Sequence, residues 1–151
     1  MLSPFLQRHA KKPPSLLHRL TRRYSASRVM RKFIYIKLYK DRVEARIVGE
    51  TTDEVFSTEA LSHPRTMAGD YEQLIELYKN VIGHYKTWTD YIFKPNLLIH
   101  FVEKTEGGYT SSETKAMKMA SEQAGSNFSW LCLDVYGPLS DQELRDVRKA
   151  L

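Results

Sequence analysis

Three features are scarce or absent in this sequence of 151 residues, and each absence excludes a class of protein. The chain has one cysteine, Cys132, so no internal disulfide can form and a reducing compartment is favoured. No apolar run approaches the roughly 18 residues that a membrane span requires, so we expect a protein that is soluble or peripheral at a membrane. Residues 1–32 contain no Asp or Glu, which sets this segment apart from the rest of the chain.

The positive charge is concentrated in that first segment. Residues 1–32 hold nine Lys or Arg, whereas the remaining residues hold 14 basic and 18 acidic side chains. The folded part is therefore expected to be mildly acidic, and the basic pI does not by itself indicate a nucleic-acid-binding domain. We assign residues 1–31 to a basic tail that is disordered or amphipathic, and residues 32–151 to a single domain.

Within the tail, apolar residues recur at helical spacing from Ser15 to Tyr24 among basic residues, as in a basic amphipathic helix. The side chains expected to contact a membrane or a partner are Leu16, Leu17, Arg19, Leu20, Arg22 and Arg23. Two other interpretations stay open. An Arg-rich, acid-free leader is also typical of an organellar transit peptide, and translation that starts at Met30 would leave this segment out of the protein.

The first half of the domain is expected to form a β-meander followed by a long helix. Residues 33–39 and 42–48 alternate in polarity, which predicts an antiparallel hairpin with one solvated face. Residues 54–61 supply a weaker third strand. Asp70 then caps the helix with the clearest apolar stripe in the sequence. That stripe consists of Tyr71, Leu74, Ile75, Tyr78, Ile82 and Tyr85.

The second half is expected to form parallel crossovers. Residues 97–102 are a nearly continuous apolar run, which is typical of a strand buried on both faces. Gly107 and Gly108 then predict a tight turn, because glycine adopts backbone angles closed to other residues. Thr110 and Glu113 have the spacing of a capping box, in which each side chain accepts a hydrogen bond from the backbone amide of the other residue.

The helix that follows this box carries an apolar stripe, and a strand at residues 128–133 comes after it. We expect Ala116, Met119, Ala120 and Gln123 along one side of the helix, flanked by Met117 and Ala124. A second capping box, Ser140 with Glu143, precedes a short terminal helix. The resulting order, β-β-β-α-β-α-β-α, predicts an α/β fold with a mixed five-stranded sheet of order 3-2-1-4-5, the ribonuclease-H-like arrangement.

Several short motifs of this chain resemble the first half of MreB, the bacterial rod-shape-determining protein of the actin-like family. The resemblance covers roughly residues 55–134. It is carried by His63–Tyr71, by Lys94-Pro95 before an apolar strand, and by Gly108-Tyr109-Thr110 with Glu113, Ala116, Ala120 and Ala124-Gly125. It implies an actin-like ATPase half-domain.

The sequence departs from that family where nucleotide would bind. Actin-like ATPases place an acid and glycines at the end of the first strand, where the acid organises a metal ion and glycine amides surround phosphate. Residues 35–38 contain neither acid nor glycine. The second phosphate loop and the adenosine pocket belong to the other half of the family's fold, which these residues do not include. Glu113 matches a family position that helps to place the attacking water, but the capping box explains this residue without nucleotide.

Other chemistry finds little support in the sequence. A ribonuclease-H-like nuclease needs clustered carboxylates, one of them on the first strand, which has none. The five histidines show no pair at metal-ligand spacing. Cys132 lies in a predicted core strand without an evident histidine partner, so we interpret it as a packing residue.

The sequence therefore predicts a non-catalytic module of MreB-like or actin-like fold that acts in interaction or scaffolding, linked to cell-shape or envelope machinery. No catalytic residue, cofactor or metal is expected. A cytoskeletal or envelope-associated protein is the expected partner, a membrane surface can be reached through the tail, and the expected location is cytoplasmic or at the inner face of the membrane. The alternatives are a nucleic-acid-binding protein that uses the tail and an ATPase half completed by a second chain.

Overall fold

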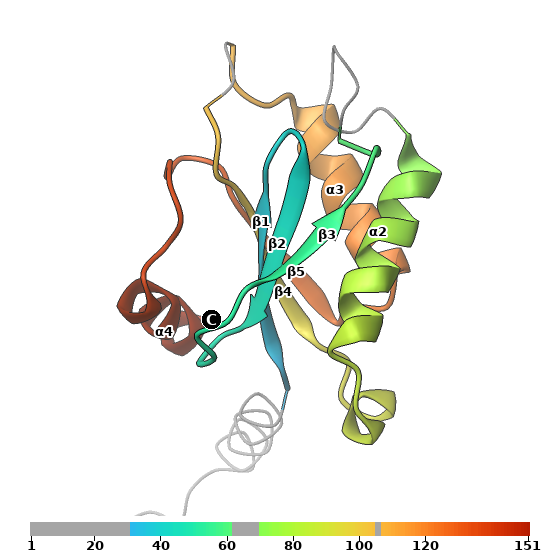
Figure 1. The fold of residues 1–151 in the computed structure, drawn as a ribbon, viewed down its shortest axis with the longest axis vertical. Helices are drawn as coiled ribbons and strands as arrows, with labels where there is room; N and C mark the ends of the chain where they lie inside the picture. Colours follow the sequence, from blue (N-terminus) through green and yellow to red (C-terminus); the bar gives the residue numbers. More distant parts are fainter. Residues whose placement is uncertain (1–30, 62–69, 105–106) are drawn as a thin grey trace, which may run out of the picture. The chain divides into compact units, whose positions relative to one another are not determined.

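A computed structural model describes residues 31–61, 70–104 and 107–151 of the chain. These residues form β1 (Phe33–Leu38), β2 (Arg42–Ile47), β3 (Glu54–Ser57), α2 (Tyr71–His84), η1 (Trp88–Tyr91), β4 (Asn96–Phe101), α3 (Ser111–Gln123), β5 (Phe128–Cys132) and α4 (Asp141–Ala150), as Figure 1 shows. The tail residues predicted to contact a membrane or a partner, Leu16, Leu17, Arg19, Leu20, Arg22 and Arg23, lie outside the described residues.

The five strands form one sheet of order β3-β2-β1-β4-β5. β1 pairs antiparallel with β2, and β2 pairs antiparallel with β3. β4 lies parallel to β1 on one side and to β5 on the other, as strands joined by crossover helices must. The strand order and directions confirm the predicted mixed sheet. This strand order is the predicted ribonuclease-H-like arrangement.

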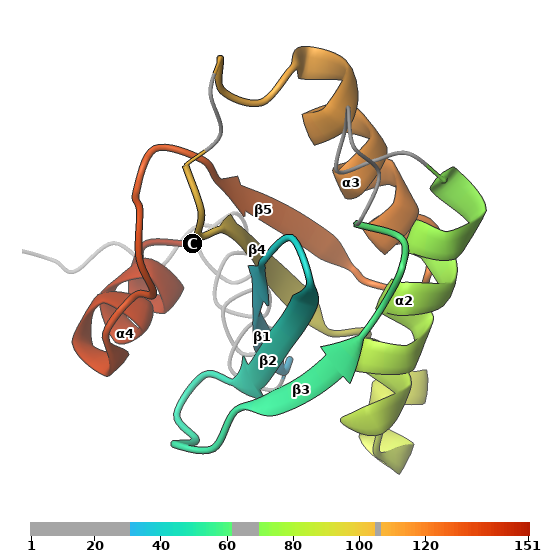
Figure 2. The ribbon, with the colours of Figure 1, turned by 45° about the horizontal axis from the view of Figure 1, so that its top comes forward.

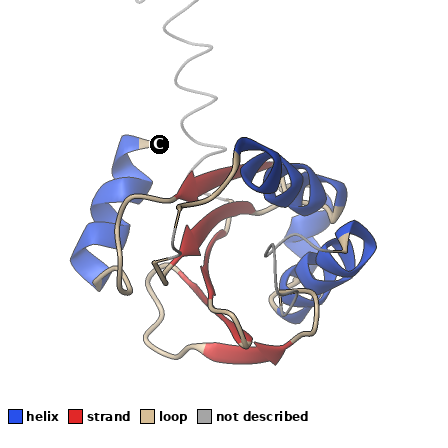
Figure 3. Ribbon diagram, turned by 90° about the horizontal axis from the view of Figure 1, so that it is seen from above, coloured by secondary structure: helices blue, strands red, loops and turns tan. Residues whose placement is uncertain are grey.

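The larger apolar core lies between the sheet and the helices α2 and α3, which cover the same face (Figure 2, Figure 3). Ile34, Ile36 and Leu38 of β1 point into it and are completely buried. Leu74 of α2 and Met117 of α3 meet them from the helical side. The alternation of β1 predicted this face, because every second side chain of a strand lies on the same side.

The opposite face of the hairpin is not solvated in β1, which corrects the prediction. Tyr35 and Lys37 point to this face and are buried. The face is covered in part by α4, whose Leu144 packs into a second apolar cluster with Tyr35 (Figure 2). Lys37 can be buried because its charge is paired with Glu44 and Asp53. The charged residues of this face alternate with apolar residues along the strand, as they would on a solvated surface, but in this fold they form ion pairs with one another.

Side-chain caps begin α2, α3 and α4, as predicted. The carboxylate of Asp70 accepts hydrogen bonds from the second and third amides of α2. Thr110 with Glu113 and Ser140 with Glu143 form complete capping boxes. These local signals fixed the helix starts because each cap satisfies amides that have no partner within the helix.

The buried face of α3 differs from the predicted stripe. Met119 is 50% exposed and Gln123 is also exposed, whereas Met117, Ala120 and Ser121 are buried. The two methionines are two positions apart, so they cannot share one side of a helix. Contacts with α2 and β5 select Met117, whose sulfur accepts a hydrogen bond from a tyrosine of α2, and Ser121, which bonds a serine of β5.

Candidate functional site

Open α/β sheets usually bind ligands at the carboxyl ends of their parallel strands. At this edge the β1–β2 turn lies next to the segment that follows β4. The backbone N–H of Lys40 in the turn donates to Oε2 of Glu103 at 2.9 Å. The Tyr109 hydroxyl donates to the carbonyl oxygen of Glu103 at 2.6 Å. The backbone amide of this turn is thus bonded to a carboxylate of the chain itself.

The glycine turn and Glu113 lie at the same edge. Gly107 and Gly108 have φ values of 86° and 72°, the left-handed region that favours glycine. Oε2 of Glu113 accepts from the Thr110 amide at 2.8 Å and from its hydroxyl at 2.9 Å, while the Glu113 amide donates back at 3.2 Å. The predicted capping role of Glu113 is confirmed.

Lys37 stands on the part of β1 where the actin-like resemblance would place a metal-organising acid. Its ammonium lies 2.8 Å from Glu44 and 3.0 Å from Asp53, and its side chain is 7% exposed. Burial alone would lower the pKa of Lys37, but the hydrogen bonds to the two carboxylates outweigh it and raise the pKa above its usual value. A fixed positive charge at this place repels a divalent cation.

A buried hydrogen-bond chain joins β1, β4 and the segment before α4. Nε2 of His100 lies 2.6 Å from the carbonyl oxygen of Val135, which can only accept, so Nε2 carries the proton. Nδ1 then accepts from the Tyr35 hydroxyl at 2.7 Å, and that hydroxyl accepts from the Leu139 amide at 2.9 Å. Burial is the main cause that lowers the pKa of His100, so the imidazole is neutral. These contacts hold the connection between β5 and α4 against the sheet.

The largest exposed apolar side chains of the described residues gather in η1 and the residue after it. Trp88, Tyr91 and Ile92 are 77%, 77% and 67% exposed. We call these three side chains the aromatic turn. Figure 1 shows η1 beyond the carboxyl end of α2. Exposed apolar residues that cluster in this way often mark an interaction site.

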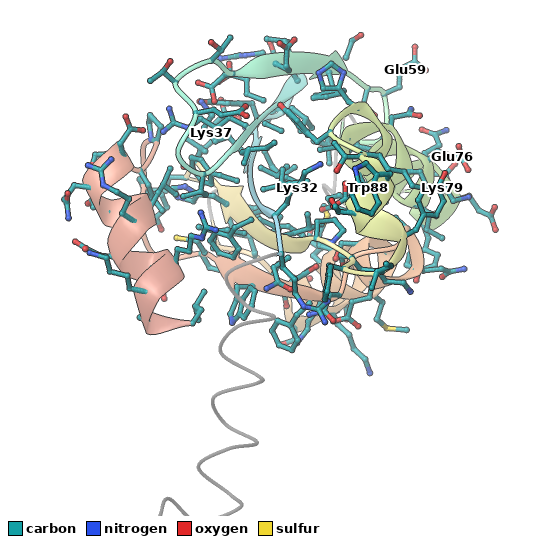
Figure 4. The ribbon with its side chains drawn as sticks, turned by 90° about the horizontal axis from the view of Figure 1, so that it is seen from below. Lys32, Lys37, Glu59, Glu76, Lys79 and Trp88 are labelled. Atoms are coloured by element: carbon teal, nitrogen blue, oxygen red, sulfur yellow. The ribbon has the colours of Figure 1, made fainter. Side chains whose placement is uncertain are left out.

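The aromatic turn is held by a polar anchor that joins it to the residue before β1 (Figure 4). The ammonium of Lys32 lies 2.7 Å from Asp90 and 2.9 Å from the Thr87 hydroxyl, and it also donates to the carbonyl oxygen of Tyr85. Asp90, in the middle of η1, is buried and accepts from the Thr87 amide at 2.6 Å. Because Asp90 faces inward, its neighbours Trp88 and Tyr91 face outward.

One cationic side chain contacts the aromatic turn, and a second contacts the phenylalanine that follows it. The ammonium of Lys86 lies 4.2 Å from the centroid of the Tyr91 ring. The guanidinium of Arg31 lies 6.0 Å from the Phe93 ring and donates to the carbonyl oxygen of Lys94 at 3.2 Å. Arg31 and Lys32 are the last two of the nine basic residues in the first 32 positions of the chain.

The described residues contain no group of three or more His, Cys, Asp or Glu side chains placed to hold a metal ion. No helix in the described ranges is both long and apolar enough to cross a membrane. The thiol of Cys132 is partly buried, and burial raises its pKa above the usual value.

Comparison with known proteins gives matches among solved structures only. No protein-family model and no curated protein matches the sequence. The chain is similar to MreB5 of Spiroplasma citri bound to ADP, with a TM-score of 0.45 and 14% identity over 68% of this chain and 38% of that one. It is similar to the same protein bound to AMPPNP with a TM-score of 0.46 and 16% identity over 69% and 39%. The chain thus spans less than two thirds of these neighbours.

Sequence reasoning located part of this picture and missed part. It placed Glu113 and the glycine turn correctly. It did not find the pairing of Lys32 with Asp90, which joins residues 58 positions apart. It also missed the contact of Tyr35 with His100, since a histidine within an apolar run gives no sign of its partner.

Proposed function

We propose that this chain is a non-catalytic interaction module of actin-like fold that attaches to an anionic membrane surface through the aromatic turn. The observation that carries the proposal is the display of Trp88, Tyr91 and Ile92 at 67–77% exposure on a turn fixed by Lys32 and Asp90. The anchor matters because a fixed turn does not lose conformational freedom when it binds.

The chemistry of the surface favours a membrane as its partner. Trp and Tyr are enriched at membrane interfaces, where their rings lie at the level of the lipid headgroups. Lys86 at the Tyr91 ring and Arg31 at the neighbouring Phe93 ring supply positive charge, and each such residue near an anionic leaflet contributes about 1 kcal/mol.

The absence of catalysis is the second part of the proposal. Lys37 occupies the part of β1 where an acid would organise a metal, the amide of Lys40 is bonded to Glu103, and Glu113 caps α3. These three contacts support the proposal, because a cation disfavours a metal ion and a carboxylate disfavours phosphate at the positions that the sequence resemblance implies. A link to cell-shape or envelope machinery, and a cytoskeletal partner, are further parts of the proposal that rest on the sequence resemblance.

Co-sedimentation of the full chain with lipid vesicles tests the membrane attachment. We expect binding to vesicles of phosphatidylcholine with phosphatidylserine, little binding to phosphatidylcholine alone, and weaker binding as salt increases. Replacement of Trp88 and Tyr91 together by Ala should reduce the bound fraction by roughly tenfold or more, since each ring buries apolar area in the interface.

The matched control is Tyr136→Ala, which removes an exposed aromatic residue remote in sequence from the turn. It should leave vesicle binding unchanged. Equal binding by the Trp88 and Tyr91 double variant and the parent chain would contradict the proposal. Aromatic and basic side chains also bind single-stranded nucleic acid, so retention of an oligonucleotide by the chain without any vesicle binding would favour that partner instead.

A further inference from the structure

The free edge of the sheet at β3 borders a groove on the helical side. The groove has a volume of about 280 Å³. It is lined by Ser57 and Thr58 at the end of β3 and by Glu72, Gln73, Glu76, Leu77 and Asn80 of α2. Figure 1 and Figure 2 both show α2 beside β3. The volume is near the lower end of the range for small-molecule pockets and suits one or two side chains.

The floor and the walls of the groove differ in chemistry. Leu77 is 4% exposed and forms an apolar floor. Glu72 and Glu76 are one helical turn apart on α2, and both are exposed. Glu76 has a partner in Lys79 at 3.0 Å, and Glu72 has no ion-pair partner among the residues that the structure describes. A cationic side chain that enters the groove therefore finds negative charge above an apolar surface.

The strand beside the groove has an edge with which no other described strand pairs. Among the residues that the structure describes, β3 pairs with β2 on one side only and stands at the end of the sheet. It contains neither lysine nor proline, two residues that commonly prevent edge strands from pairing. Proteins that bind extended peptides often use an edge strand next to a helix: the backbone supplies hydrogen bonds and alternate side chains enter the groove.

The two faces of β3 call for different side chains in such a partner. Phe56 packs toward the core. If a further strand pairs with β3, its side chains on the Phe56 face of the sheet point toward the groove, where Glu72 and Glu76 lie. Val55 lies on the opposite face, opposite Glu44 of β2, and is 64% exposed. An added strand would cover Val55 with its alternate residues.

We propose that an extended polypeptide segment of alternating basic and apolar residues binds along the free edge of β3. Its basic side chains enter the groove between Glu72 and Glu76, its apolar side chains cover Val55, and its backbone pairs with β3. This site is separate from the aromatic turn, so the domain can hold such a partner whether or not it attaches to a membrane.

Fluorescence anisotropy with the full chain tests the proposal. The probe is a short labelled peptide of alternating lysine and valine, and its counterpart has glutamate in place of lysine. We expect saturable binding of the lysine peptide and none of the glutamate peptide. Glu72→Gln together with Glu76→Gln should weaken the lysine peptide by roughly tenfold, and Val55→Ser should also weaken it.

The matched control removes two negative charges elsewhere, with Glu122→Gln and Asp134→Asn, both exposed. It should bind the lysine peptide like the parent chain, and circular dichroism should show both double variants folded. If the two double variants weakened the binding of the lysine peptide equally, the effect would come from net charge and the proposed site would be wrong. Unchanged binding of a lysine peptide that is N-methylated at every amide would also overturn the site, because such a peptide has no backbone N–H left to pair with β3.

Sedimentation velocity of the unliganded chain tests whether a second copy of the chain occupies the groove. A concentration-dependent dimer that the Glu72 and Glu76 changes abolish would show that the groove is occupied by another copy, which contradicts the proposed partner. A monomer at all concentrations, with peptide binding as described, supports it.

Discussion

Loss of the Asp90 carboxylate should destabilise the whole domain and not only the aromatic turn. The side chain of Asp90 is 6% exposed and accepts from Lys32 at 2.7 Å, from the Thr87 amide at 2.6 Å and from the Thr87 hydroxyl at 3.1 Å. In Asp90→Ala the ammonium of Lys32, 20% exposed, keeps only the Tyr85 carbonyl and the Thr87 hydroxyl.

These contacts determine how much Asp90→Ala should lower the free energy of unfolding. Removal of one partner from a fully buried ion pair costs about 3–5 kcal/mol, and the residual exposure and remaining acceptors of Lys32 reduce that figure. We therefore expect Asp90→Ala to lower the free energy of unfolding by about 2–3 kcal/mol. Lys32→Met combined with Asp90→Ala should cost about 1–2 kcal/mol less than the sum of the two single changes, because the double variant buries no unpaired charge.

Urea denaturation followed by circular dichroism measures both quantities. The pH dependence gives a second measurement. Burial alone would raise the pKa of Asp90, but the hydrogen bonds from Lys32 and Thr87 outweigh it and hold the pKa below its usual value. The contribution of the pair is therefore complete above about pH 4 and is lost as pH falls through the folded pKa. A change below about 0.5 kcal/mol in Asp90→Ala, or strict additivity in the cycle, would refute this reasoning.

Three further predictions concern the core, the buried histidine and the helix cap. Leu74→Ala should lower the free energy of unfolding by about 2–5 kcal/mol, whereas Glu76→Ala on the outer side of α2 should change it by no more than about 0.5 kcal/mol; equal effects in urea denaturation would mean that α2 faces the other way. The pKa of His100 is lowered in the folded chain, so the unfolded state binds more protons below about pH 6.5 and the free energy of unfolding should decrease there as pH falls. His100→Gln should show a smaller decrease. An identical pH profile of the variant and the parent chain would exclude this effect of His100. Calorimetric titration with Mg-ATP should detect no binding. Glu113→Gln keeps a capping side chain, so it should hardly change the free energy of unfolding. Saturable ATP binding that this change weakens would restore the ATPase interpretation.

Local sequence signals predicted most of the fold. The capping boxes at Thr110 and Ser140, and the cap at Asp70, acted over three or four residues and each began a helix where expected. The strand alternation and the crossover rule then left one sheet order that satisfied all elements. These predictions held because the interactions that decide them lie within a short segment or follow from the chirality of the chain.

The candidate sites were harder to predict from local sequence signals than the fold was. The exposure of Trp88 and Tyr91 was not predicted, because the sequence gives no sign of whether an aromatic residue in a connection is buried. Their outward position depends on Asp90 turning inward to meet Lys32, a contact between distant segments. The groove beside β3 likewise arises only when α2 is packed next to an edge strand.

The sequence by itself determined the elements, their order and the cap at Glu113, because hydrophobic period, turn residues and capping act locally. Only the tertiary structure decided which face of α3 is buried, since Met117 and Met119 are equivalent until α2 is in place. It also decided that Lys37 is buried and not solvated, because the charges of Glu44 and Asp53 come from other segments. Burial of a charge is favourable only where its partners lie within hydrogen-bond distance, and those distances are set when the chain folds.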